Sequence, residues 1–145
     1  MVTAQARAAA RRAPGFGPPV PFSWDGLVAR AQALATRRYV ARQPAHDVAP
    51  DFDAATRRAY GAAERLAGFV RLMPATYLAP VPVSINLVEG GAARALTATD
   101  GLFAGDKPTA PAGFRVLNPS LSGDWLAFLG ASYFRAVGPQ DQYGL

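Results

Sequence analysis

The residues best suited to chemistry lie near the end of the chain, at Tyr133, Phe134, Arg135 and Tyr143. Three of these side chains are aromatic, and the guanidinium of the fourth donates several hydrogen bonds. The small residues at 130–132 let a ligand or a neighbouring backbone approach closely. Because sugar rings stack on aromatic faces and sugar hydroxyls accept from arginine, these four residues are candidates for carbohydrate binding. Ordinary packing between strands is the alternative interpretation.

Other common chemistries lack the residues that they need. The chain has no cysteine, and its one histidine, His46, lies beside Asp47 in a polar stretch flanked by prolines. We interpret His46 as an exposed loop residue rather than a metal ligand or a general base. The sequence contains no Gly-x-Ser-x-Gly nucleophile motif and no glycine-rich phosphate loop. We therefore predict no metal site, no cofactor and no serine-type catalysis.

Paired carboxylates are the remaining route to catalysis, because glycoside hydrolysis needs an acid and a base on either side of the scissile bond. Asp51 and Asp53 are better explained as caps of a helix. Four further aspartates lie in turn-like contexts: Asp100, Asp106, Asp124 and Asp141. We favour structural roles for all six residues and assign no catalytic residue.

The formal net charge of +5 is distributed unevenly along the chain. Residues 1–71 carry a formal charge of +6, and the remaining residues carry −1. Proteins that bind single-stranded nucleic acid intersperse aromatic residues among their basic residues. The arginines of this chain are not interspersed with aromatic residues in this way. We interpret these arginines as solvated and predict no nucleic-acid partner. A small basic protein that docks on anionic partners through residues before Arg71 is an alternative function.

Residues 1–21 are predicted to form a flexible leader, since they consist mostly of alanine, arginine, glycine and proline. Arginines interrupt the alanines, so the apolar segment of a secretory signal is not visible. The sequence also lacks the run of roughly 18 apolar residues that a membrane span requires.

The rest of the chain predicts two helices followed by antiparallel strands. Ser23 is a good N-cap for a helix that ends near Arg37, and a second helix is predicted over 54–63. Glu89, Gly90 and Gly91 form a hairpin signal between two predicted strands, and Asn118 begins another turn. The predicted strands are 81–88, 94–99, 113–117, 125–130 (buried on both faces) and 132–137. The fold class is therefore mainly β, an α+β arrangement with one or two N-terminal helices.

Several segments resemble the periplasmic glucan biosynthesis family, G and D types. The most specific is Phe-Leu-Gly-Ala-Ser-Tyr-Phe-Arg-Ala at 128–136, preceded by Gly-Phe-Arg-Val-Leu at 113–117. Residues 22–39 are similar to the family's first helix, and Pro-Val-Ser-Ile-Asn at 82–86 is similar to one of its strands. The family's Phe-Phe-His-x-Gly segment is replaced here by Leu-Met-Pro-Ala-Thr at 72–76.

The resemblance implies a fold and a partner. It implies that 22–145 is the N-terminal portion of a β-supersandwich domain of the galactose mutarotase-like type, without the family's C-terminal immunoglobulin-like domain. It also implies a periplasmic location and a β-glucan oligosaccharide or polysaccharide as partner. Family members resemble glycoside hydrolases or transglycosylases that act on β-1,2-linked glucan.

The family's catalytic aspartates are expected beyond Leu145, so the resemblance carries no catalytic residue onto this chain. We therefore expect a truncated protein of osmoregulated periplasmic glucan synthesis or processing, which binds carbohydrate and is inactive alone. A non-catalytic carbohydrate-binding module and the small basic interaction protein are the alternatives. Unpaired strand edges predict a tendency to aggregate or to exchange strands.

Overall fold

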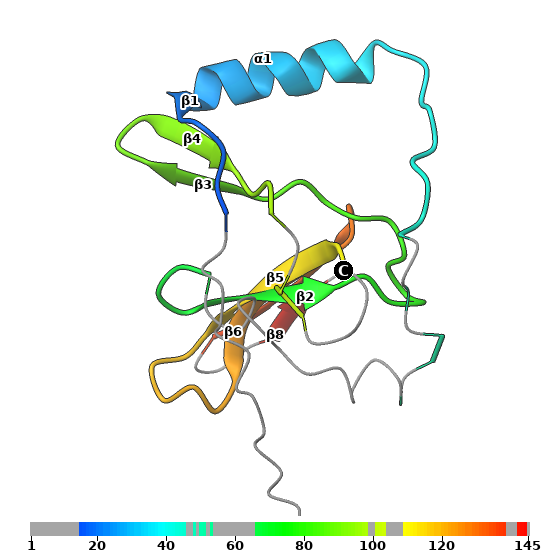
Figure 1. The fold of residues 1–145 in the computed structure, drawn as a ribbon, viewed down its shortest axis with the longest axis vertical. Helices are drawn as coiled ribbons and strands as arrows, with labels where there is room; N and C mark the ends of the chain where they lie inside the picture. Colours follow the sequence, from blue (N-terminus) through cyan, green and yellow to red (C-terminus); the bar gives the residue numbers. More distant parts are fainter. Residues whose placement is uncertain are drawn as a thin grey trace, which may run out of the picture.

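The computed structural model contains, within the residues it describes, two antiparallel sheets and one helix (Figure 1). The described residues are 15–45, 48, 50–51, 53, 66–98, 101–103, 109–138 and, for the backbone alone, 142–144. In chain order the elements are β1 (Val20–Pro21), α1 (Trp24–Ala35), β2 (Val70–Pro74), β3 (Asn86–Glu89), β4 (Ala92–Ala95), β5 (Pro111–Leu117), β6 (Asp124–Leu129), β7 (Tyr133–Val137) and β8 (Gln142–Gly144). The prediction of a mainly β protein is confirmed.

The smaller sheet has the strand order β1-β4-β3, and the larger sheet has the order β2-β5-β6-β7-β8. Every neighbouring pair is antiparallel. The strands from β5 to β8 follow one another in sequence and in space, so this part of the larger sheet is an up-and-down meander. In Figure 1, α1 and the smaller sheet lie together above the larger sheet.

Helix α1 is present where the sequence predicted it. The Ser23 Oγ accepts a hydrogen bond from the Gly26 N–H at 3.1 Å, and the helix ends at Ala35. Every residue of α1 is exposed, and Trp24 is 72% exposed. The apolar stripe that predicts the helix therefore covers no core in the described part of the chain. Neither α1 nor any other described helix is long and apolar enough to cross a membrane. The predicted helix at 54–63 lies outside the described residues.

The hairpin of β3 and β4 differs in extent from the prediction. The strand predicted over 81–88 begins only at Asn86, so the prediction was wrong for 81–85. Prolines 80 and 82 lack the N–H that a sheet ladder needs, and the Val83 N–H donates instead to the Pro111 carbonyl at 3.0 Å. The predicted turn is confirmed, since Gly90 (φ 55°) and Gly91 (φ 76°) both adopt left-handed conformations typical of a two-residue hairpin loop. Strand β4 consequently starts two residues before the predicted return strand.

Two segments that were not predicted as strands pair with strands in the structure. Strand β2 lies at an edge of the larger sheet and ends at Pro74, a position where a missing N–H is tolerated. At the end of the predicted leader, Val20 pairs with Ala93 of β4. The Gly17 N–H also donates to the Ala95 carbonyl at 2.8 Å. The pairing of β1 completes the smaller sheet.

The core consists of two small clusters. In one, Leu72 of β2 is fully buried with Leu102 and Phe103, and Ile85, Leu96 and Phe114 pack against them. In the other, three alanines of the described chain pack together near the start of β5: Ala75, Ala79 and Ala112. The prediction that 125–130 is buried on both faces was wrong, because Trp125 is 48% and Phe128 is 39% exposed. The larger sheet therefore has exposed surface on both faces.

At Gly113, strand β5 leaves no room for a side chain against the backbone of β6. A methyl group at Gly113 would lie 2.0 Å from the carbonyl oxygen of Phe128. We expect Gly113→Ala to lower the free energy of unfolding by about 1–3 kcal/mol, because the paired strands would have to move apart. Circular dichroism during urea unfolding measures this change. Gly123→Ala is the matched control, since its methyl group would meet only the Asn118 Nδ2 at 3.5 Å. Equal losses in both variants would contradict the prediction.

Candidate functional site

The register of the larger sheet places Tyr133 and Arg135 on one face. Ala127 of β6 pairs with both Arg115 of β5 and Arg135 of β7, so the two arginines belong to one row across three strands. Leu129 pairs with Tyr133 in the neighbouring row. Residues that pair directly, or that lie two apart along a strand, share a face of the sheet. We call this the groove face, made by Met73, Arg115, Ala127, Leu129, Tyr133 and Arg135.

Phe134 lies on the opposite face, because it alternates with Tyr133 and Arg135 along β7. It pairs with Phe128, which pairs with Phe114. The ring centroids of Phe114 and Phe128 are 5.2 Å apart, and those of Phe128 and Phe134 are 6.2 Å apart. The backbone of Tyr143 in β8 pairs with Ala136 of β7. The structure thus brings Tyr133 and Arg135 together and separates Phe134 from them.

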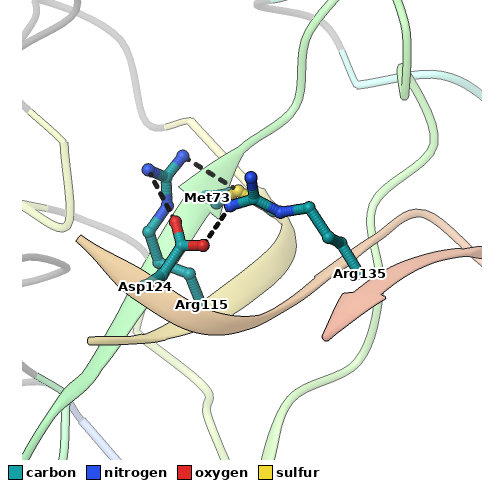
Figure 2. A network of polar contacts seen from close by, with 4 residues as sticks. All are labelled: Met73, Arg115, Asp124 and Arg135. Carbon is teal, nitrogen blue, oxygen red and sulfur yellow. Dashed lines mark hydrogen bonds and ion pairs between the residues drawn. The ribbon is translucent and has the colours of Figure 1, made fainter. Parts of the chain in front are cut away.

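Asp124 bridges the two arginines of the groove face (Figure 2). Its Oδ2 lies 3.4 Å from the Arg115 Nη1, and its Oδ1 accepts a hydrogen bond from the Arg135 Nη2. The Arg115 Nη2 also donates to the Met73 Sδ at 3.3 Å. The Asp124 side chain is only 8% exposed, whereas the side chains of Arg115 and Arg135 are 34% and 33% exposed. One nearly buried carboxylate therefore forms ion pairs with two guanidiniums that are partly exposed.

The turn between β5 and β6 positions Asp124. The Asn118 Oδ1 accepts from the Ser120 hydroxyl at 2.9 Å and from the Ser122 N–H at 3.2 Å. A shift of register between Val116 and Leu117 makes Leu117 the partner of Asp124. In a regular strand Asp124 would share a face with Phe128, but a bulge lets its carboxylate turn toward Arg115. The predicted turn at Asn118 is confirmed and holds the start of β6.

An open groove of about 1610 Å³ lies over the groove face. Its other sides come from the end of α1, the exposed segment 37–42 that descends from α1 in Figure 1, and the irregular segment 78–84. The Ala45 N–H donates to the Pro80 carbonyl at 2.7 Å and ties these two segments together. Tyr39 and Tyr133 both line the groove.

The described lining of the groove combines arginines and tyrosines with a single carboxylate. Asp124 is the one carboxylate among its described lining residues, and both of its oxygens face arginines. Across the described residues, no three histidine, aspartate or glutamate side chains gather where they could hold a metal ion. Exposed aromatic rings and guanidinium donors instead suit an extended polar ligand with flat apolar faces.

Several groove residues were not among the candidates from the sequence. Arg115 and Asp124 were considered only as strand and turn residues, and Tyr39 only as part of a helical segment. The sequence offered one signal for these residues. Arg115 and Arg135 each interrupt a predicted strand that is otherwise mostly apolar. The register that makes them neighbours depends on pairing across β6, which spacing along the chain does not reveal.

Comparisons with known proteins show the family. The model described as periplasmic glucan biosynthesis protein, MdoG, matches residues 22–145, so the chain belongs to the periplasmic glucan biosynthesis protein family. Glucans biosynthesis protein D 2 of Ralstonia nicotianae is 33% identical over an alignment that covers 99% of this chain and 32% of the relative. Probable glucans biosynthesis protein D of Shewanella oneidensis is 40% identical over an alignment that covers 44% of this chain and 14% of the relative. The chain thus spans 32% of the length of the Ralstonia relative, and the family resemblance seen in the sequence is confirmed.

Asp124→Asn tests whether the bridging carboxylate stabilises the sheet. We expect the substitution to lower the free energy of unfolding by about 1–3 kcal/mol, because Arg115 and Arg135 would be left close together without a countercharge. Urea unfolding in low salt measures the change. Glu89→Gln is the matched control, since Glu89 is exposed at the end of β3 in the smaller sheet. An Asp124→Asn protein as stable as this control would show that the bridge is dispensable.

Proposed function

We propose that this chain binds β-glucan in the groove over the larger sheet and acts in the periplasm, in glucan synthesis or processing, without cleaving the glucan itself. Membership of the periplasmic glucan biosynthesis family supports the substrate class and the compartment. One observation carries the proposal: the exposed ring of Tyr133 and the guanidinium of Arg135 lie on the same face of the larger sheet and line the groove.

Two tyrosines make stacking on sugar rings physically reasonable. Tyr133 is 44% exposed and Tyr39 is 83% exposed, so a ligand in the groove can reach both rings. Each sugar ring has an apolar face of C–H groups that packs on an aromatic ring and removes both surfaces from water. The tyrosine hydroxyls remain available for hydrogen bonds to the sugar.

The arginines supply donors for the sugar hydroxyls. A guanidinium carries five N–H donors, and the contacts to Asp124 and Met73 use only part of this capacity on Arg115 and Arg135. Both side chains are about one third exposed and line the groove, so each guanidinium can be reached from it, although the Nε of Arg115 is buried. Neutral sugar oxygens are suitable acceptors for them.

Binding without turnover follows from the chemistry of the described lining. Glycoside hydrolysis requires two carboxyl groups, one on either side of the glycosidic bond. Asp124 is the single carboxylate in the described groove, and its position between two arginines suits a structural role. We therefore expect the described groove to bind glucan without supplying the pair of carboxyl groups that would cleave it.

Calorimetric titration with linear β-1,2-glucan tests the proposal. We expect saturable binding, weakened by about three- to tenfold in Tyr133→Ala because stacking on an aromatic ring contributes about 0.5–1.5 kcal/mol. Arg135→Ala should also weaken binding. Tyr77→Ala is the matched control, since Tyr77 is also 44% exposed but does not line the groove.

Two results would contradict the proposal. If Tyr133→Ala and Tyr77→Ala bound glucan as tightly as the unaltered chain, the ligand would not occupy this groove. If the purified chain released shorter oligosaccharides from the glucan, the absence of turnover would be wrong.

A further inference from the structure

Met73 of β2 holds its sulfur against a cation. The Met73 Sδ accepts a hydrogen bond from the Arg115 Nη2 at 3.3 Å (Figure 2), although a thioether is only a weak acceptor. The Nε of Arg115 is buried and has no hydrogen-bond partner in the described part of the chain. In the planar fork of a guanidinium, the N–H groups on Nε and Nη2 point in the same direction and form one edge. The edge that faces the sulfur therefore lacks a strong acceptor.

Met73 can be reached from the groove without unfolding of the chain. The residue is only 8% exposed, but it is one of those that line the open groove. Hydrogen peroxide is close to water in size, so it can enter such a groove. The sulfur atoms of cysteine and methionine are common targets of peroxides. The chain has no cysteine and two methionines, Met1 and Met73.

We infer that Met73 is a modification site, at which peroxide converts the thioether to a sulfoxide whose oxygen is held by Arg115. The O–O bond of hydrogen peroxide breaks and an S–O bond forms, so that the sulfur loses two electrons. The second oxygen keeps these electrons, takes the proton of the transferred oxygen and leaves as water. This modification does not depend on the ligand of the groove.

The contact with Arg115 makes the sulfoxide favourable at this position. In an apolar core, a sulfoxide oxygen would be buried without a donor and would destabilise the fold. Here the oxygen can accept from both Nε and Nη2, because the unbranched side chain of methionine adapts by rotation about its single bonds. Both hydrogen bonds are charge-assisted, and the Arg115 Nη1 keeps its contact with Asp124. Oxidation would therefore strengthen the link between β2 and β5.

Peptide mass spectrometry after brief treatment with dilute hydrogen peroxide tests the reactivity of Met73. We expect its sulfoxide to form in the folded chain at a rate within about tenfold of the rate in the urea-unfolded chain, because only local access is needed. Oxidation that required global unfolding would be at least about a thousandfold slower in the folded chain. Protection of that size would overturn the inference.

Urea unfolding of treated and untreated proteins tests the role of Arg115. We expect oxidation to leave the midpoint of the unaltered chain equal or higher. In Arg115→Leu, oxidation should lower the midpoint by about 0.5 M or more, because the buried oxygen then has no donor. Met73→Leu is the matched control, since it keeps only Met1 and its midpoint should not respond to peroxide. Equal falls in the unaltered chain and in Arg115→Leu would overturn the inference.

A direct measurement of the hydrogen bond does not depend on the folding of Arg115→Leu. In the NMR spectrum of the chain labelled with 15N-arginine, the Arg115 Nε–H proton should move downfield on oxidation, because this donor gains an acceptor. The Nε–H of Arg30, an exposed arginine of α1 outside the groove, should not move and is the internal control. The Met73→Leu protein should show no shift at Arg115 either. An unchanged Arg115 signal in fully oxidised, folded protein would show that the sulfoxide is not held by this residue.

Discussion

The carboxylate of Asp124 links three neighbouring strands of the larger sheet. It lies at the start of β6 and contacts an arginine of β5 and an arginine of β7. Without a carboxylate between them, two guanidiniums of one row would repel each other across β6. Because Asp124 is nearly buried and both arginines reach solvent, the bridge loses less to desolvation than a fully buried ion pair would. The fold can therefore present two cations on one face.

The sequence predicted correctly those elements whose geometry depends only on residues close together in the chain. Ser23 caps α1 because its hydroxyl reaches an N–H three residues away, and Gly90 and Gly91 form a hairpin because they tolerate positive φ. The apolar alternation over 81–85 indicated a strand, but the flanking prolines lack donors and this segment packs beside the start of β5 instead. Strand β2 was missed because its pairing with β5 bridges about forty residues of sequence, and no local pattern records that distance.

The candidate site was predictable only in part, for a related reason. Tyr133 and Arg135 are two residues apart on a strand, so their common face follows from the period of the strand alone. Phe134 stands between them on the other face, where it joins a row of phenylalanines. Asp124 reaches the groove face only because a bulge reverses the alternation, and Tyr39 reaches the groove because the chain descends from α1. Tertiary arrangement decides both positions.

The same charges that stabilise the sheet also limit what the groove can bind. A ligand that accepts hydrogen bonds from Arg115 or Arg135 would compete with Asp124 for their donors, so tight binding at these two residues would weaken the bridge. Arg37, Arg38 and Arg42 have no carboxylate partner among the described residues, so a ligand that contacts them would disturb no described ion pair. In the described structure, one side of the groove is therefore tied to the sheet by an ion pair, whereas the arginines of segment 37–42 on the other side are not.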